Sequence, residues 1–231
     1  MTIKAQDVKE LREKTGLGMM ECKKALEEAN GNLEEAIKNL RKSSALKAEK
    51  KASRTAVEGI IISKISDNEI TFVEVNCETD FVAKDENFIN FCEEVLKVAV
   101  DISSEENLLD EVSESMEKQR MSLVQKIGEN IIIRKVKKIT GEVLESYIHS
   151  NKKIAAGVSL DQGSPEIAKE VAMHIAASNP IVLSPEDLDE SYINSEREIF
   201  RSQVEKEDKP EEIKEKMIQG KLNKQLADVS L

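Results

Sequence analysis

The chain has 231 residues, of which 39% are hydrophobic and 34% charged, a composition typical of a helix-rich protein with much solvated surface rather than one continuous core. The net charge of −11 is uneven: residues 1–56 carry 13 Lys and Arg against 9 Asp and Glu, a net +4, which leaves −15 for residues 57–231. A surface this acidic repels phosphate backbones, so it disfavours direct nucleic-acid binding and favours a protein partner.

Three short amphipathic helices are predicted at the N-terminus. Apolar residues recur at helical spacing in residues 5–11, two glycines interrupt the pattern, and a second helix is expected over residues 19–29. A capping-box-like pair beginning at Asn32 predicts the start of a third helix. We expect a small three-helix domain over residues 1–45, followed by a Lys/Ala/Ser-rich, partly helical linker over residues 46–56.

Beyond the linker the apolar period changes, which predicts a first core subdomain over residues 57–140. A β-hairpin is expected first, then two helices and a return to strand. The expected elements are strands over 57–65 and 70–75 joined by a turn at Asp67-Asn68, helices over 88–99 and 116–127, and a strand over 130–139.

A second core subdomain is predicted over residues 141–182. A hairpin joins strands over 143–149 and 154–160, and a helix begins at Pro165 and ends before Asn179-Pro180. Strands and helices in blocks predict an α+β body with antiparallel sheet rather than a doubly wound parallel fold.

The last part, residues 183–231, is predicted to form a protruding helical hairpin. Two charged helical stretches, over 186–207 and 210–227, share only a narrow apolar seam, the amount that two antiparallel helices need against each other. Whether this coiled-coil-like arm forms a homodimer, contacts another protein or does neither is left open. The seam residues are Ile193, Phe200, Val204, Ile213, Met217 and Leu222.

No catalytic or cofactor-binding pattern is found. The two histidines, His149 and His174, have no nucleophile paired to them by spacing, and we expect His174 to be a structural residue on an apolar helix face. The three cysteines include no CxxC pair, and phosphate-binding glycine loops are absent. No apolar run resembles a signal peptide or a membrane span, so we expect a cytoplasmic protein without membrane contact.

Two long motifs carry a resemblance to a known family. They are VKELREKTGLGMMECKKAL at residues 8–26 and VEVNCETDFVA at residues 73–83, and shorter matches occur at 127–131, 146–149 and 172–180. With these motifs the chain resembles the elongation factor Ts family along essentially its whole length. The resemblance implies a UBA-like N-terminal domain and a non-enzymatic guanine-nucleotide exchange factor without cofactor or metal. Its partner would be elongation factor Tu, both GDP-bound and nucleotide-free.

The resemblance implies that the N-terminal domain contacts the G domain of elongation factor Tu through Arg12, Met19, Met20 and Lys23. Two adjacent methionines cannot both face the interior of one short helix, and flexible thioethers suit an adaptable binding surface. The alternative is that Met19 fills the core of the helical hairpin.

The resemblance also implies that Asp80 and Phe81 project toward the partner's magnesium site, with Val82 and Ala83 shaping the loop. At a strand-to-helix turn, however, Thr79 or Asp80 commonly caps the next helix, and a residue such as Phe81 staples it. Both explanations fit the sequence.

Three further residues are implied to contact the partner, namely Ile127, Gly128 and His149. A helix C-cap is the ordinary explanation for the glycine, and an exposed imidazole at a hairpin turn is unremarkable.

The chain departs from the family pattern in two places. Lys84-Asp85 stands where Arg-Asn is common, which keeps the positive charge and adds a carboxylate. Family members usually continue beyond Leu231 with a strand and a helix, so we expect the second core subdomain to be incomplete.

Two other functions are weighed against exchange. A generic helical adaptor or chaperone-like module would use the head and the arm without needing Asp80 or Phe81. A metal-dependent hydrolase would need a His/Asp cluster that the sequence does not show.

Overall fold

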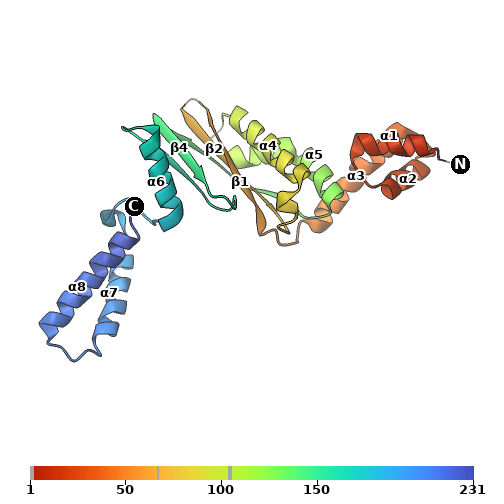
Figure 1. The fold of residues 1–231 in the computed structure, drawn as a ribbon. Helices are drawn as coiled ribbons and strands as arrows, with labels where there is room; N and C mark the ends of the chain where they lie inside the picture. Colours follow the sequence, from red (N-terminus) through yellow and green to blue (C-terminus); the bar gives the residue numbers. More distant parts are fainter. Residues whose placement is uncertain (1–2, 67, 104–105) are drawn as a thin grey trace.

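The computed structural model describes residues 3–66, 68–103 and 106–231, and it forms an elongated molecule of three parts (Figure 1). A three-helix head lies at one end, a body of antiparallel sheets and helices lies in the middle, and a helical hairpin projects from the other end. The predicted α+β class is confirmed. Residue 67, half of the expected turn at Asp67-Asn68, lies outside the described residues.

The head consists of α1 (Ala5–Thr15), α2 (Met19–Glu28) and the first half of α3 (Leu33–Lys51). Leu11 and Leu26 are fully buried where the helices meet. The predicted start of the third helix is confirmed. α3 then runs on without a break, so one helix spans the end of the proposed head and the first part of the proposed linker.

The body begins with the antiparallel sheet β1-β2-β3, formed by β1 (Glu58–Ser66), β2 (Glu69–Cys77) and β3 (Ile132–Thr140). Alternate side chains of β2 are buried against α4 (Glu86–Asp101) and α5 (Leu108–Ile127). The order of these elements was predicted correctly.

α5 begins earlier than the sequence pattern predicted. The expected start was Met116, but Leu108 and Val112 continue the same buried stripe toward the N-terminus at a spacing of four residues. Acidic residues between them, Asp110 and Glu111, dilute the apolar pattern, yet they suit the first turn of a helix because they face its positive end.

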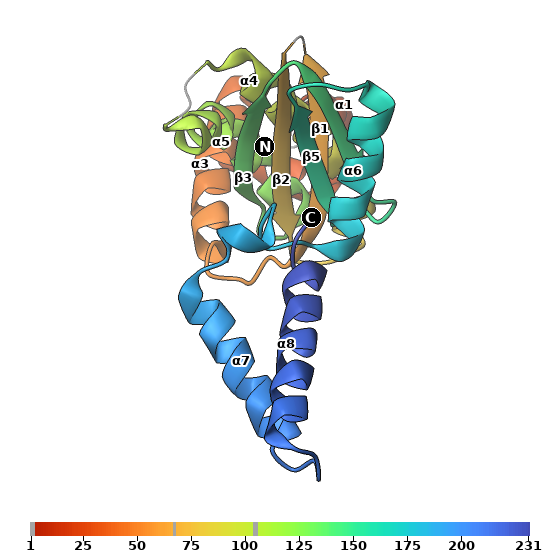
Figure 2. The same ribbon diagram turned by 90° about the vertical axis from the view of Figure 1, so that its left-hand side faces the viewer.

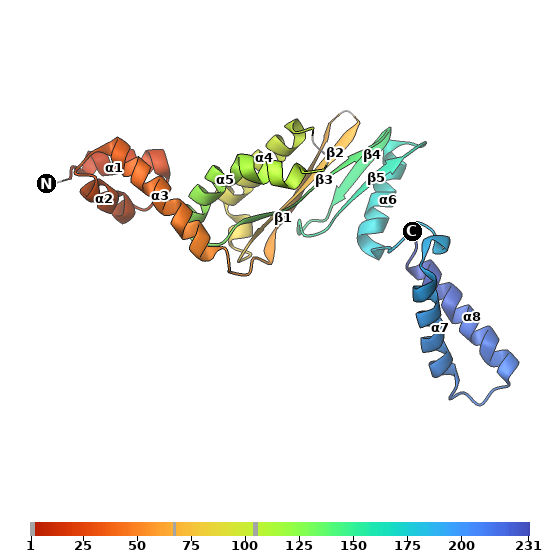
Figure 3. The same cartoon turned by 180° about the vertical axis from the view of Figure 1, so that it is seen from behind.

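The second hairpin, β4 (Val143–Ile148) and β5 (Ala155–Leu160), packs on the sheet face turned away from α4 and α5 (Figures 1 and 3). Gly157 makes this close packing possible, since a Cβ there would lie 2.6 Å from the Phe72 ring. α6 (Pro165–Ser178) covers the outer face of the hairpin, as Figure 2 also shows. The expectation for His174 was wrong, because this side chain is exposed.

The arm consists of a short 3₁₀ turn, η2 (Pro185–Asp187), followed by α7 (Glu190–Val204) and α8 (Glu211–Asp228), which pack against each other. The predicted helical hairpin is confirmed. The predicted apolar seam was wrong at one position. Ile213 is 45% exposed, and Ile218 is the residue of α8 that is buried instead. Among the helices of the described residues, none has the length and apolarity of a membrane span.

Candidate functional site

An exposed loop links the end of β2 to α4. It contains η1 (Val82–Lys84), a 3₁₀ turn whose Val82 and Ala83 pack against the main core of the body. The residues just before this turn point outward: Asp80 is exposed, and the Phe81 side chain is 81% exposed. The loop is therefore attached on one side and presents an aromatic ring and a carboxylate to solvent on the other.

The helix that follows the loop is capped by another residue. Asp85 is the N-cap of α4, and its carboxylate accepts a hydrogen bond of 2.8 Å from the Asn87 N–H. The alternative that Asp80 caps α4 and that Phe81 staples it is thus wrong. Thr79 does not cap α4 either, but its Oγ1 accepts a 3.4 Å hydrogen bond from the Val82 N–H in the preceding 3₁₀ turn η1. The carboxylate that departs from the family pattern has a structural role at this helix start.

Glu129 holds the start of the loop in place. One of its carboxylate oxygens accepts hydrogen bonds of 3.0 Å from the backbone N–H groups of Glu78 and Thr79, and the other accepts a 2.7 Å bond from the Thr79 hydroxyl. In return, the Glu78 carboxylate accepts a 2.6 Å bond from the Asn130 N–H. Sequence reasoning missed Glu129 as a site residue; its place directly after the helix-ending glycine was the available signal.

Asp80 forms an ion pair at the surface. Its carboxylate accepts a 2.9 Å hydrogen bond from Lys84 Nζ. This bond and the charge of Lys84 hold the pKa of Asp80 below its usual range, and Lys153 in the β4–β5 turn adds a further attraction. Asp80 is therefore a carboxylate at neutral pH, and the β4–β5 turn lies near the loop.

The remaining body residues lie at nearby turns. Gly128 ends α5 with a φ of +90°, and its N–H donates to Val124 O at 2.9 Å, so the C-cap explanation applies to it. Ile127 is half-buried against the core. His149 is exposed in the β4–β5 turn, with Nδ1 3.0 Å from the Tyr147 hydroxyl.

The residues singled out in the head lie on its surface. Arg12 and Lys23 are exposed, and Met19 and Met20 are 58% and 75% exposed. Filling of the head core by Met19 is therefore wrong; Leu17 is the buried residue of this turn. Met20 and Lys23 line a groove of about 690 Å³ between α2 and α3.

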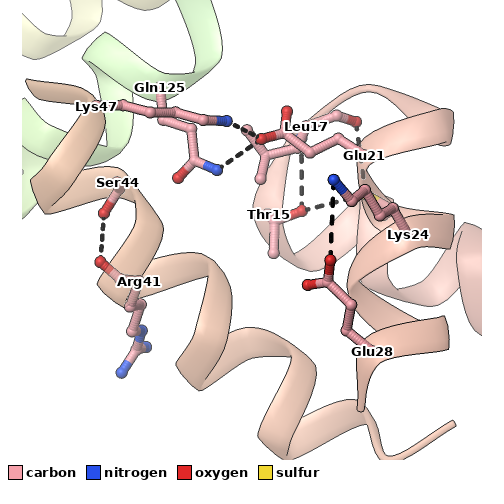
Figure 4. A network of polar contacts seen from close by, with 10 residues as sticks. Thr15, Leu17, Glu21, Lys24, Glu28, Arg41, Ser44, Lys47 and Gln125 are labelled. Carbon is pink, nitrogen blue, oxygen red and sulfur yellow. Dashed lines mark hydrogen bonds and ion pairs between the residues drawn. The ribbon is translucent and has the colours of Figure 1, made fainter. Parts of the chain in front are cut away.

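A polar network connects the head to the body (Figure 4). Glu21 of α2 accepts hydrogen bonds from Lys47 of α3 and, at 2.8 Å, from Gln125 Nε2 of α5. Burial alone would raise the pKa of Glu21, but the hydrogen bonds from Lys47 and Gln125 outweigh it and leave the pKa below its usual range. Glu21 is thus a charged acceptor at the junction of head and body.

Side chains that commonly bind metal ions were compared across the described part of the chain. Within the described ranges, no three His, Cys, Asp or Glu side chains come together as a metal ion would require. Cys77 lies close to the loop, but burial, with the nearby charge of Glu129, raises its pKa to about 12 and keeps it a thiol.

Comparisons with known proteins agree on one family. A family model described as "Elongation factor TS" matches residues 78–231. An "Elongation factor Ts" of Marinobacter nauticus is 53% identical over 231 residues, which cover 99% of this chain and 80% of that protein. An "Elongation factor Ts" of Teredinibacter turnerae is 51% identical over 236 residues, covering 100% of this chain and 80% of that protein.

Proposed function

The chain belongs to the elongation factor Ts family of translation elongation factors, and from this premise we propose that it is a guanine-nucleotide exchange factor for elongation factor Tu. It binds elongation factor Tu in its GDP-bound form, promotes release of GDP and so allows GTP to load. No covalent bond is made or broken in this process, so the factor needs no catalytic residue and no cofactor.

The observation that carries the proposal is the exposure of Phe81 on a loop that is held in place. An aromatic ring that stays in water loses the free energy of about 1.5–3 kcal/mol that its burial would contribute. The hydrogen bonds from the loop to Glu129 keep the loop, and with it the Phe81 ring, in this exposed position. A ring fixed in this way is ready to enter a partner without first ordering its own loop, which lowers the entropic cost of binding.

The chemistry of the partner site makes both loop residues useful. A GTPase holds GDP through backbone N–H groups of its phosphate loop and through Mg²⁺ that neutralises the phosphate charge. In our proposal, Phe81 wedges apart the packed elements beneath that site. Asp80, charged at neutral pH, disturbs the hydrogen bonds and charges that keep the ion in place, while Val82 and Ala83 anchor the loop.

Docking of the head supplies the rest of the free energy. Accelerating release by about four decades requires about 5.5 kcal/mol of transition-state stabilisation, more than burial of one aromatic ring provides. We propose that the exposed head residues Arg12, Met19, Met20 and Lys23 bind the G domain of elongation factor Tu. This contact places the loop at its target.

The turns beside the loop form the third contact of the proposal. Ile127, Gly128 and His149 lie in or next to turns of the body, and we propose that they touch the partner around the loop. By linkage, a factor that lowers GDP affinity must bind GDP-loaded elongation factor Tu more weakly than the nucleotide-free form, by the same ratio.

We also propose how the chain divides into structural units that serve this function. We propose a head over residues 1–45, core subdomains over 57–140 and 141–182, and an arm over 183–231, acting in the cytoplasm where translation takes place. Exposed isoleucines on the arm, Ile199 and Ile213, support the further proposal of a homodimer. Sedimentation of the chain alone over a range of concentrations tests it.

Stopped-flow release of a fluorescent GDP analogue from elongation factor Tu, at fixed magnesium, tests the role of the loop. Phe81→Ala should lower the maximal release rate about tenfold to a hundredfold, the equivalent of about 1.5–3 kcal/mol. Leu183→Ala is the matched control, because Leu183 is an apolar residue of similar exposure, 73%, in another part of the chain. A double variant with Phe81→Ala and Asp80→Asn that accelerates GDP release as strongly as the intact chain would show that exchange does not depend on these two side chains.

A further inference from the structure

Helix α3 belongs to both the head and the body. In its first half, Ala36 and Leu40 are buried in the head core, and near its end Ala48 is buried in the body core. The segment between them joins two separately packed units. The angle between head and body therefore depends on how straight this helix stays.

The middle of α3 has a feature that favours bending. Ser43 and Ser44 occupy this segment, and the Ser44 hydroxyl donates a 2.7 Å hydrogen bond to Arg41 O, a backbone carbonyl of the preceding turn (Figure 4). Serine side chains that bond back to the helix in this way compete with the backbone ladder and often bend helices. Without other contacts, the head would swing about this point.

The network around Glu21 bridges this point. Figure 4 shows the Glu21 carboxylate of α2 facing Lys47, beyond the serines on α3, and Gln125 on α5, which lie side by side and both donate to the same carboxylate oxygen. The next residue of α5, Lys126, donates a 2.6 Å hydrogen bond to Asn87 Oδ1 at the start of α4. Asn87 in turn bonds to Asp85, the last residue of the exposed loop.

We propose that Glu21, Lys47 and Gln125 form a latch that fixes the angle of the head to the body, and that they are positioning residues for nucleotide exchange. The latch keeps the head surface and the Phe81 loop in one arrangement, so that both meet the partner together. This inference rests on the proposed function, since it concerns how the two proposed docking surfaces cooperate.

Effective concentration explains why a fixed angle matters. When two linked surfaces are held in the geometry that the partner requires, the second contact follows the first at a high effective concentration. A head that moves freely still binds the partner, but the Phe81 loop on the body then reaches its target less often. A higher concentration of the chain is therefore needed for half-maximal GDP release. Once both surfaces are docked the wedge itself is unchanged, so the maximal rate is retained.

Charge reversal tests the latch. Glu21→Lys and Lys47→Glu each place like charges together and should raise the half-saturating concentration for GDP release about tenfold, with the maximal rate unchanged. The double variant restores an ion pair, and the Gln125 amide can serve either orientation because it carries both a donor and an acceptor. It should return to within about threefold of the intact chain, since a lysine is less favourable than a glutamate in the first turn of α2.

Two comparisons keep this test specific. Glu28→Lys reverses a charge of α2 that pairs within the same helix, with Lys24 at 3.8 Å, and should leave the half-saturating concentration unchanged. Phe81→Ala should show the opposite pattern, a lower maximal rate. If the single latch variants are impaired and the double variant is not rescued, Glu21 contacts the partner directly and the positioning role is overturned.

A second readout uses the free chain. ¹⁵N relaxation should show head and body tumbling together in the intact chain and the double variant, and a faster head in the single variants. A head that stays fixed in the single variants, or a loosened head with unchanged half-saturation, overturns the proposal. If the intact chain does not accelerate GDP release, the proposed function fails and the role in exchange with it, while the tumbling still shows whether the latch exists.

Discussion

Replacing Glu129 by alanine tests whether exchange needs an ordered loop. The Glu129 carboxylate accepts two backbone N–H bonds and one hydroxyl bond from Glu78 and Thr79. Bonds to a charged acceptor contribute about 1.5–3 kcal/mol each when shielded, but Thr79 is exposed, so we take about 1 kcal/mol each. The alanine variant therefore loses about 3 kcal/mol, which weakens the ordered loop about a hundredfold against open states.

The consequence for exchange follows from the fraction of chains whose loop stays in place. Apparent affinity falls with that fraction, and the hundredfold weakening of the ordered loop sets the largest possible loss, so we expect a release rate about tenfold to a hundredfold lower at subsaturating concentrations. Stopped-flow release measures this loss, and amide hydrogen exchange over residues 78–82 measures the order of the loop in the same variant.

Glu129→Gln is the matched control. Its amide oxygen still accepts the two backbone bonds, and its NH₂ can donate to the Thr79 hydroxyl, so we expect release within about threefold of the intact chain. If Glu129→Ala loses amide protection but releases GDP at the intact rate, loop order does not matter and the reasoning is refuted.

Three further predictions concern stability. Gly128→Ala should lower the free energy of unfolding by about 1–2 kcal/mol, because the φ of +90° disfavours a side chain. Gly220→Ala, in an open stretch of α8, should raise it by about 0.5–1 kcal/mol. Equal melting temperatures of the two variants would contradict both predictions. Gly157→Ala should cost about 1–3 kcal/mol, since its Cβ would meet the Phe72 ring, and an unchanged urea midpoint would show that the hairpin moves freely. The hydrogen bonds from Asn87 hold the pKa of Asp85 below its usual range, so this cap stabilises the fold at neutral pH, and its contribution is lost as pH falls through the lowered pKa. The difference in urea midpoint between the intact chain and Asp85→Ala should therefore shrink as the pH is lowered through and below the ordinary range of an aspartate, and a difference that stays constant would contradict the assignment.

The order of the elements could be predicted because each carries a local signal. Glycines and capping residues mark the head helices, and alternating apolar residues mark the strands. Errors arose where the signal was diluted: acidic residues masked the first turns of α5, and weak periodicity put Ile213 rather than Ile218 in the seam of the arm.

The candidate site could be predicted only in part. The motif resemblance singled out Asp80 and Phe81 as candidates, and the structure shows only that both are exposed. A preceding Asp or Thr was as good a candidate for the helix cap as Asp85, which is the cap in the structure. The contacts that hold the loop and the head in place could not be predicted from the sequence. Glu129 bonds to Thr79 across 50 residues and Gln125 to Glu21 across 104, and no local pattern encodes such long-range pairing.

The rate of GDP release from elongation factor Tu, followed at fixed magnesium as the intact chain is added, tests exchange most directly. If the chain is an exchange factor, the rate rises with the concentration of the chain and saturates far above the spontaneous rate. A rate that stays at the spontaneous value while the chain is demonstrably bound to elongation factor Tu would contradict exchange and favour an adaptor.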